Sequence, residues 1–324
     1  MNVFIDTNVF LSFYHFTSDD LEELKKLRVL LKDEKVRLLL PDQVVFEFNR
    51  NRDSKIDDAL KRLKDHKLIH QFPQFCKDYD EYEKIRSLQD DSKRALADLI
   101  QKAEEDIGAA KLKADDVIRG LFDAADTLPT TDELYHRARR RTDIGNPPGD
   151  KGSVCDRLIW EHLLESVPDG QDLHIVTADG HFASALDATS LSSFLVQEWQ
   201  ENKHADGILY TSLTPFFRKH FPDISLASEL QKDLQIGRLA NSGSFAETHA
   251  VVAELDQLGD FSTQQINAII AAAISNNQVY WIIHDPDVHE FLLSVAEAKS
   301  DDSQAANLAQ LLHLLGVATE TEAQ

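Results

Sequence analysis

Cysteine is scarce in this chain of 324 residues, and long apolar runs are absent. The two cysteines, Cys76 and Cys155, are too few for a framework of disulfide bonds, which favours a reducing compartment. No stretch approaches the roughly 18–20 apolar residues that a membrane helix needs. Asp6 interrupts the apolar run at the start of the sequence, so that run does not have the pattern of a secretory signal. These absences predict a cytoplasmic protein that does not enter a membrane.

Basic residues are also in the minority, and they are unevenly distributed. The chain contains 34 lysines and arginines against 56 aspartates and glutamates, a net charge of −22. Residues 223–324 contain fifteen acidic and three basic residues, a net charge of −12, which leaves −10 for the first 222 residues. The total disfavours nonspecific attraction to nucleic acid, but the local potential decides what a cleft attracts. The first 222 residues contain two basic clusters: Arg50, Arg52, Lys55, Lys61, Arg62, Lys64 and Lys67, and Arg137, Arg139, Arg140 and Arg141.

Short apolar runs, typical of buried strands, lead into acids at three places. They are Val3–Ile5 before Asp6, residues 36–40 before the helix that contains Glu47, and residues 173–177 before Asp179. In open α/β sheets, ligands bind outside the carboxyl ends of the strands. We therefore expect these three acids to converge on one edge of a sheet.

A fourth acid, Asp156, comes at the start of a helix that follows the proline- and glycine-rich loop of residues 145–152. Asp156 shares one helical stripe with Ile159 and Trp160, and a carboxylate on a buried face is costly unless it is paired or bound to a cation. The alternative interpretation is structural, because Ser153 and Asp156 have the spacing of a helix-capping pair.

Together these residues predict a metal site. Carboxylates packed within a few ångströms repel one another, which raises their pKa values unless a cation neutralises them. Oxygen ligands suit Mg²⁺ or Mn²⁺, and such ions activate water and stabilise charge on a phosphoryl group. Thr7 is a candidate to hydrogen-bond a neighbouring carboxylate, and Asn8 to add a neutral oxygen or to orient an acid. The candidate catalytic residues and metal ligands are Asp6, Glu47, Asp156 and Asp179.

The ordered set of motifs resembles the PIN-domain nucleases. The motifs that carry the resemblance are Asp6-Thr7-Asn8, Glu47 within Pro41–Glu47, Asp156–Trp160, Thr177-Ala178-Asp179 and Glu198-Trp199. Two of these motifs, Asp156–Trp160 with the loop before it and Glu198-Trp199, resemble a PIN-like subgroup that has a long helical insertion. The resemblance covers roughly residues 1–222. It implies a Rossmann-like α/β domain with a parallel sheet, dependence on Mg²⁺ or Mn²⁺, and cleavage of RNA or, less often, DNA.

Two positions depart from the family pattern. The family often has a second acid two residues after the one at Asp179, and this chain has His181 there. His181 either weakens a second metal site or is itself a ligand, and the alternative is a plain turn histidine. Cys155 stands where the family often has glycine. Asp150 is close enough in sequence to be confused with Asp156, and we prefer Asp156 for its place on the apolar stripe.

The remaining sequence predicts two helical regions. Residues 54–141 are charged, poor in glycine and helical in pattern, and we interpret them as a helical insertion within a PIN-like domain of residues 1–222. Residues 223–324 are interpreted as a small, acidic, all-helical domain that binds a protein partner or regulates access to the cleft. The sequence leaves self-association open.

The function predicted from the sequence is a metal-dependent endonuclease, with RNA preferred to DNA. We expect the nucleic acid to be bound by the cationic side chains of Arg50, Arg52, Arg137, Arg139, Arg140 and Arg141. One alternative is a catalytically weak PIN-like protein that binds nucleic acid or acts as a scaffold. Another is a phosphatase with Asp6 as nucleophile, but such chemistry usually needs a second acid two residues on, where this chain has Asn8.

Overall fold

The computed structural model describes residues 1–15, 21–65, 72–150, 152–222, 226–297 and 305–316. The chain divides into two compact units, Met1–Pro222 and Asp223–Gln324. A helix start predicted at residues 17–20, Lys67 of the first basic cluster and a frayed end predicted at residues 319–324 lie outside the described residues.

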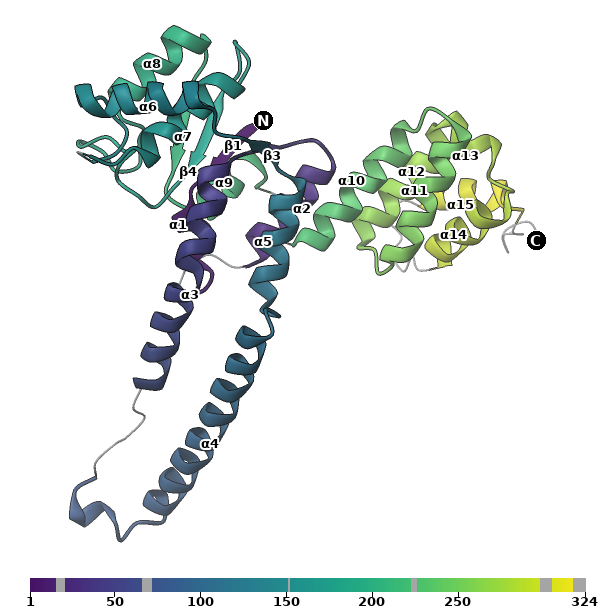
Figure 1. Ribbon diagram of the computed structural model, residues 1–324. Helices are drawn as coiled ribbons and strands as arrows, with labels where there is room; N and C mark the ends of the chain where they lie inside the picture. The colour runs from purple at the N-terminus through teal and green to yellow at the C-terminus, as the bar shows by residue number, and fades with distance from the viewer. Residues whose placement is uncertain (16–20, 66–71, 151, 223–225, 298–304, 317–324) are drawn as a thin grey trace. The chain divides into compact units, whose positions relative to one another are not determined.

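The first unit is built on one sheet of five parallel strands in the order β3-β2-β1-β4-β5 (Figure 1). The strands are β1 (Asn2–Ile5), β2 (Arg37–Pro41), β3 (Asp126–Leu128), β4 (Leu173–Val176) and β5 (Gly207–Tyr210). Every residue of β1 and β4 is buried, as expected of parallel strands covered by helices on both faces. The predicted α/β class with a parallel sheet is confirmed.

The same unit contains helices on and beside this sheet. They are α1 (Thr7–Ser12), α2 (Leu21–Lys32), α3 (Asp42–Asp65), α4 (Asp80–Gly108), α5 (Lys113–Ala124), α6 (Asp132–Ile144), α7 (Cys155–Ser166), α8 (Ser193–Lys203) and α9 (Leu213–His220), with a short 3₁₀ turn η1 (Gln74–Cys76). The helices α2 and α5 pack together, and so do α6 and α7. Among the described residues, no helix combines the length and the apolar character needed to cross a bilayer.

The order of the strands creates a switch point beside β1. The chain runs from β1 to β2 and β3 on one side, then crosses to β4 and β5 on the other. Ile5 and Val176 are level in the ladder between β1 and β4, so these two strands end side by side. In parallel sheets a crevice forms outside the strand ends at such a point, and Asp6 and Asp179 lie directly beyond these ends.

The region of residues 54–141 differs from the prediction in one respect. The sequence predicts helix throughout it, but β3 lies within it and forms the edge of the sheet. β3 was missed because it has only three residues and its first two are exposed, so it carries no apolar run.

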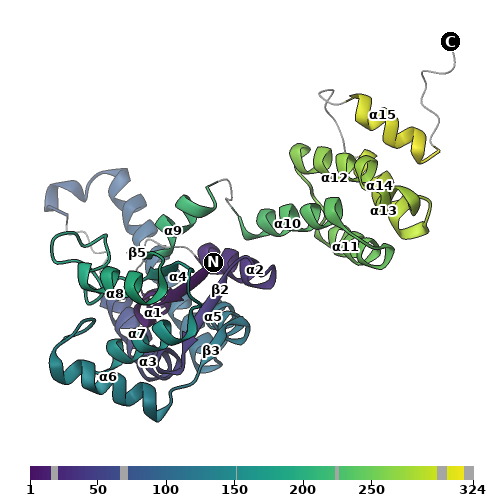
Figure 2. The ribbon, with the colours of Figure 1, turned by 90° about the horizontal axis from the view of Figure 1, so that it is seen from above.

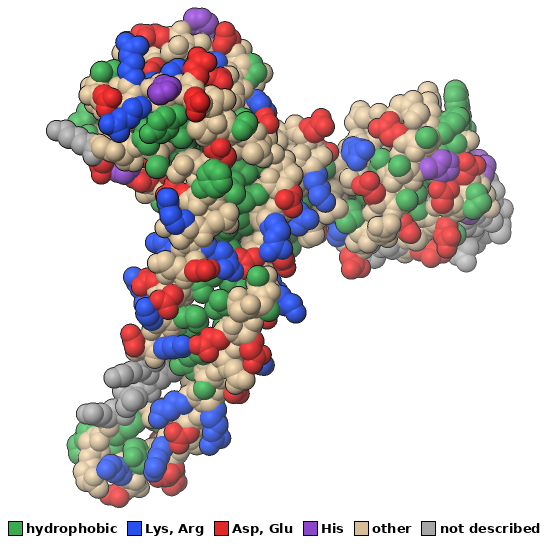
Figure 3. All heavy atoms as spheres, in the orientation of Figure 1, with side chains coloured by type: hydrophobic (Ala, Val, Ile, Leu, Met, Phe, Trp, Pro, Cys, Tyr) green, Lys and Arg blue, Asp and Glu red, His purple; other side chains and the backbone are tan. Residues whose placement is uncertain are grey.

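Part of that region forms a helical arm, while α5 and α6 pack against α2 and α7. The distal half of α3 and α4 extend side by side away from the sheet (Figure 1), and Lys64 Nζ lies 2.5 Å from Glu104 Oε1 between them. None of the 29 residues of α4 is buried. Figure 3 shows side chains of both charges along the arm, with hydrophobic side chains between its two helices. The arm therefore has only a thin apolar seam.

The second unit is helical in its described part (Figure 2). Its helices are α10 (Ala227–Asn241), α11 (Phe245–Leu258), α12 (Thr263–Ser275), α13 (Asn277–Trp281), α14 (Pro286–Glu297) and α15 (Ala305–Leu314). The helix α12 begins with a capping box between Ser262 and Gln265 and packs against α10, α13, α14 and α15. Buried residues from α10 to α15 form one apolar core, separate from that of the first unit.

A buried histidine lies under α9. His174 in β4 is 5% exposed, and its ring centroid is 4.7 Å from that of His220. The hydroxyl of Tyr210 lies 2.8 Å from His220 Nε2 and 3.5 Å from His174 Nδ1. Burial, and then the charge of His220, lower the pKa of His174 to about 4. The folded protein therefore favours the neutral ring.

We predict that His174 makes the fold sensitive to acid. An unfolded histidine has a pKa of about 6.5, above the folded value, so the unfolded state binds more protons and stability falls as the pH drops from about 6.5 to about 4. His174→Gln keeps a polar side chain that cannot be protonated. The stability deficit of this variant relative to the wild type should shrink between neutral pH and pH about 5 in urea unfolding. A deficit that is the same at both pH values would contradict the prediction.

Candidate active site

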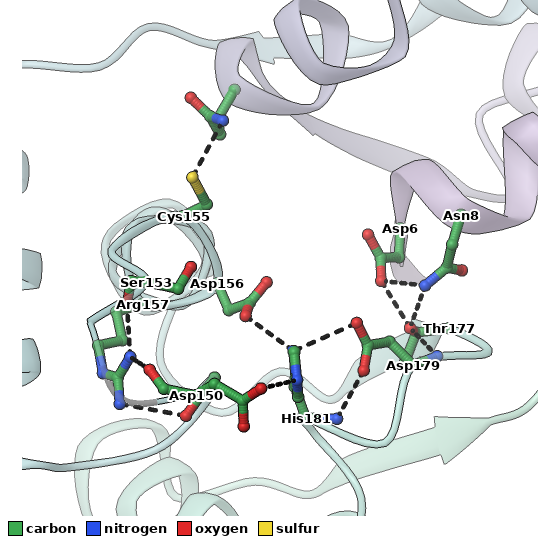
Figure 4. A network of polar contacts seen from close by, with 12 residues as sticks. Asp6, Asn8, Asp150, Ser153, Cys155, Asp156, Arg157, Thr177, Asp179 and His181 are labelled. Carbon is green, nitrogen blue, oxygen red and sulfur yellow. Dashed lines mark hydrogen bonds and ion pairs between the residues drawn. The ribbon is translucent and has the colours of Figure 1, made fainter. Parts of the chain in front are cut away.

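Asp6 lies at the carboxyl end of β1 and is only 9% exposed. It is the N-cap residue of α1, yet its side chain caps no helical N–H. Its carboxylate instead accepts hydrogen bonds from the Thr177 hydroxyl at 2.6 Å and the Asn8 amide at 2.7 Å (Figure 4). The backbone N–H of Asp6 donates to the carbonyl of Val176 at 2.9 Å. The ends of β1 and β4 together therefore fix the orientation of Asp6.

Asn8 and Thr177 connect these two strand ends. The side-chain amide of Asn8 also donates to Thr177 Oγ1 at 3.2 Å, and its Oδ1 accepts from the backbone N–H of Ala178 at 3.2 Å. The Thr177 hydroxyl in turn accepts from the backbone N–H of Asp179 at 2.9 Å. Through these contacts Asn8 orients Asp6, and Thr177 links Asp6 to Asp179.

His181 lies among three carboxylates (Figure 4). Its Nδ1 is 3.0 Å from Asp156 Oδ2 and 3.2 Å from Asp179 Oδ2, and its Nε2 is 3.2 Å from Asp150 Oδ2. Burial lowers the pKa of His181, but the three carboxylates together raise it by more than burial lowers it. The pKa of His181 is therefore raised. Asp150, set aside in the sequence interpretation, thus belongs to the same cluster as Asp156.

Asp156 is presented by the first turn of α7. The N-cap residue of this helix is Val154, and no side chain caps the helix there. The capping-pair interpretation of Ser153 and Asp156 is therefore wrong, because the helix begins two residues after Ser153. The next residues of the stripe, Ile159 and Trp160, are 1% and 0% exposed, so Asp156 lies half-buried at the start of the buried part of α7.

Glu47 is presented by the second turn of α3, close to α7. The side-chain amide of Gln43, one turn earlier, lies 3.4 Å from Cys155 Sγ at the start of α7. Burial raises the pKa of Glu47, and the charges of Asp156 and Asp179 raise it further. The start of α3 therefore faces the start of α7 across the ends of the strands.

The four acids act on one another electrostatically. Burial raises the pKa of Asp6 to about 6, and the charges of Asp156 and Glu47 add to the increase although Thr177 opposes it. Burial also raises the pKa of Asp156, which Asp179 increases further and His181 reduces. The prediction that the acids converge on one edge therefore agrees with where the structure places Asp6, Glu47, Asp156 and Asp179.

The loop before α7 lies directly against Asp156. Gly149 has a φ of +91°, and a Cβ built there would lie 2.7 Å from Asp156 Oδ2, so only glycine fits. Arg157, 2% exposed, holds this loop through hydrogen bonds to four backbone carbonyls, those of Asn146, Gly149, Asp150 and Ser153. Sequence reasoning missed Arg157. Its signal is a cation in the first turn of a helix, directly after a glycine-rich loop.

A sequence profile of the PIN domain matches residues 3–182, more than half of the chain, and this span includes all four acids. The chain belongs to the PIN-domain family. PIN domains are generally nucleases. No curated protein and no solved structure matches the chain.

Arg141 of this PIN domain is structural, which corrects its assignment to nucleic-acid binding. It is 6% exposed and pairs with Glu161, at 2.9 Å from Nε, and with Glu198. Glu198 also accepts a hydrogen bond from Trp160 Nε1 at 2.7 Å, and the rings of Trp160 and Trp199 lie 5.6 Å apart. The Asp156–Trp160 and Glu198-Trp199 motifs therefore meet in one buried network that joins α6, α7 and α8.

Arg52 is also engaged within the fold. Its Nε and Nη2 lie 2.7 Å and 2.6 Å from the two carboxylate oxygens of Asp115, and its guanidinium lies 5.3 Å from the centroid of the Tyr14 ring. The Tyr14 hydroxyl donates to the same carboxylate at 2.5 Å. This bidentate pair fixes α3 against α5. Because Asp115 neutralises the guanidinium of Arg52, Arg52 is a poor candidate to bind a polyanion.

The other predicted arginines differ in their availability. Arg137 pairs with Glu161 and Glu165, and Arg139 pairs with Asp143 at 3.2 Å. Arg50 and Arg140 are exposed and form no ion pair within the described parts of the chain. The candidates that remain accessible to a phosphate are Arg50, Arg139 and Arg140.

The PIN fold implies a divalent cation, and the donor chemistry of the site fits one. The four carboxylates offer the oxygen donors that Mg²⁺ and Mn²⁺ prefer, and burial with mutual repulsion raises the pKa values of Asp6, Glu47 and Asp156. A hydrogen bond from the Thr7 side chain lowers the pKa of Glu47 and only partly offsets that increase. In the described part of the chain, no three His, Cys, Asp or Glu side chains are grouped as they would be around one ion. Two of the four carboxylates are instead bonded to His181.

We predict that Arg141 and its neighbour Arg140 contribute very differently to the stability of the fold. Arg141→Ala removes the buried cation that Glu161 and Glu198 share and leaves Glu161 only its contact with Arg137; loss of one partner of a buried pair costs about 3–5 kcal/mol. Arg140→Ala removes an exposed side chain from the same helix and should change stability by less than about 0.5 kcal/mol. Urea unfolding of both variants measures the difference. Equal losses would show that Arg141 does not hold the three helices together.

Proposed function

We propose that this PIN domain is a divalent-metal-dependent endonuclease that hydrolyses phosphodiester bonds, with RNA as its preferred substrate and DNA as the second candidate. The observation that carries the proposal is the convergence of four carboxylates at the edge of a parallel sheet. Burial and mutual repulsion raise the pKa values of three of them. Such repulsion is relieved by a bound cation.

The proposed ligands of Mg²⁺ or Mn²⁺ are Asp6, Glu47, Asp156 and Asp179. The bound ion would lower the pKa of a water molecule and stabilise charge on the phosphoryl group. Thr177 and Asn8 hold Asp6 in place, and Arg157 holds the loop that lies against Asp156. His181 bonds to both Asp156 and Asp179, so we infer that metal binding requires it to release at least one of these carboxylates.

The proposed path of the nucleic acid follows the accessible arginines. Arg139 and Arg140 are exposed on α6, which packs against the helix that presents Asp156. Arg50 lies one turn after Glu47 on α3. These side chains supply local positive potential in a chain with a net charge of −22, and local charge governs the encounter with a polyanion. The acidic second unit is proposed to bind a protein partner.

A second candidate function is a PIN domain that binds nucleic acid with weak or no catalysis. The observation that favours it is His181, which stands where the family often has a second acid and which bonds to two of the proposed ligands. The two functions differ in one measurable property, because only the nuclease cleaves labelled RNA or DNA in Mn²⁺ and stops when a chelator is added.

We predict that Asp6→Asn abolishes metal-dependent cleavage while stabilising the metal-free protein. Asparagine keeps the shape and the hydrogen bonds of Asp6 but removes a charge whose pKa is raised to about 6. A folded pKa above the unfolded value means that the charged form destabilises the fold above pH about 6, and this penalty disappears toward pH about 4. The variant should therefore melt at a higher temperature than the wild type at neutral pH, with the difference lost on acidification.

Mn²⁺ provides the matching test of the site. Binding to the folded state alone stabilises a protein by about 2.7 kcal/mol at a hundredfold excess over Kd. Mn²⁺ should raise the melting temperature of the wild type and have a much smaller effect on Asp6→Asn. Wild-type cleavage by the variant, or no response of the wild type to millimolar Mn²⁺, would contradict the proposed site.

The path of the nucleic acid is tested by salt. Each phosphate contact on a single strand contributes a slope of about −0.7 to the dependence of log affinity on log salt. Replacing Arg139 and Arg140 by alanine should weaken binding to all sequences and flatten the slope by about that amount for each lost contact. Binding is measured in Ca²⁺ to prevent turnover. Identical slopes for the wild type and the double variant would place the path elsewhere.

A further inference from the structure

One stripe of α3 runs along the mouth of the candidate active site. Gln43, Phe46, Glu47 and Arg50 have the spacing i, i+3, i+4 and i+7, which places them on one side of a helix. The first of them, Gln43, contacts Cys155 at the start of α7, and Glu47 interacts with the charges of the site. Gln43 and Glu47 therefore face α7 and the acids, and Phe46 and Arg50 lie beside them on the same side of the helix.

Phe46 is exposed on this stripe. Its side chain is 62% exposed, whereas Val44 and Phe48 on the same helix are 0% and 6% exposed. Phe46 stacks on no other ring within the described residues. A single exposed apolar side chain needs no explanation by itself, but this one is adjacent to a proposed metal ligand.

Arg50 is the neighbour of Phe46 on the helix surface. It is exposed and pairs with no carboxylate in the described parts of the chain. Its charge acts to lower the pKa values of both Glu47 and Cys155, which places its positive field at the mouth of the site. Residues four apart on a helix have Cβ atoms about 5–6 Å apart, so one nucleotide can contact Phe46 and Arg50 together.

We propose that Phe46 and Arg50 form a nucleotide-binding edge, in which a base next to the scissile phosphate stacks on Phe46 while an adjoining phosphate pairs with Arg50. This inference rests on the proposed nuclease function. Aromatic side chains bind bases through their faces and do not depend on base identity. A base in a duplex has both faces covered by its neighbours, so the edge accepts only an unpaired nucleotide. Phe46 holds that nucleotide in place and takes no part in the chemical step.

The first test measures binding of a fluorescein-labelled RNA of about twelve unpaired nucleotides, a length within the range of single-strand sites. Ca²⁺ replaces Mn²⁺ to prevent turnover. Phe46→Ala should weaken binding about 5- to 150-fold, the loss expected for one base stacked on an aromatic ring, and Phe46→Trp should keep the wild-type affinity. The matched control is Phe75→Ala, because Phe75 is 71% exposed but lies in η1, between the distal ends of α3 and α4.

The second test locates the stacked base. An abasic site is placed at successive positions of the oligonucleotide, and one position should weaken binding to the wild type about as much as Phe46→Ala does. At that position the abasic site should have no further effect on Phe46→Ala, because the two changes remove the same contact. Losses that add at every position would overturn the stacking contact.

Arg50 is tested by salt dependence. Arg50→Ala should flatten the slope of log affinity against log salt by about 0.7, the value for one phosphate contact on a single strand. Arg86→Ala is the matched control, because Arg86 is exposed on α4 and far along the arm. Equal slopes for the wild type and Arg50→Ala would overturn the role of Arg50.

The outcomes separate this inference from the function on which it rests. If the wild type neither binds nor cleaves the oligonucleotide, the proposed function fails. If the wild type binds and cleaves but Phe46→Ala behaves like Phe75→Ala, only the nucleotide-binding edge is overturned. The response of the melting temperature to Mn²⁺ should be the same in Phe46→Ala and the wild type, which shows that any loss of binding does not come from a damaged metal site.

Discussion

Repulsion among buried carboxylates is the constraint on which the rest of this structure depends. Asp6 and Asp179 follow two neighbouring parallel strands, and Glu47 and Asp156 lie in the first two turns of helices that face the same strand ends. A charged carboxylate in such a place is costly without a partner. The protein meets this constraint with hydrogen bonds from Thr177 and Asn8 on one side of the cluster and with His181 on the other.

The same constraint explains how the surrounding polar residues are used. Arg157 and Gly149 allow a loop backbone to lie against Asp156, since the arginine holds the loop carbonyls and the glycine leaves room. Arg141 and Arg52 neutralise acids inside the fold. A protein with a net charge of −22 therefore uses part of its limited positive charge for structure. Only a few arginines remain near the site for a polyanion.

Phe46 and the helical arm show two different kinds of exposed apolar surface. Along the arm, α4 buries none of its residues, because two helices on their own cannot enclose the seam between them. Phe46 is instead a single ring beside a proposed ligand, on a helix whose neighbouring apolar residues are buried. Position relative to the acids, and not exposure alone, gives Phe46 a proposed role.

The sequence by itself determined the parallel α/β class and the position of the central strands, because apolar runs that end in acids are local patterns. It also pointed to Asp6, Glu47, Asp156 and Asp179, since each follows a strand or lies in the first turns of a helix. Tertiary structure alone decided which charges are free. Arg141 and Arg140 are neighbours in sequence, yet only Arg141 meets Glu161 and Glu198, because one side of α6 packs against α7. The edge strand β3 pairs with β2, and His181 contacts Asp150 and Asp156. These partners are distant in the chain, so a local sequence pattern cannot predict either set of contacts.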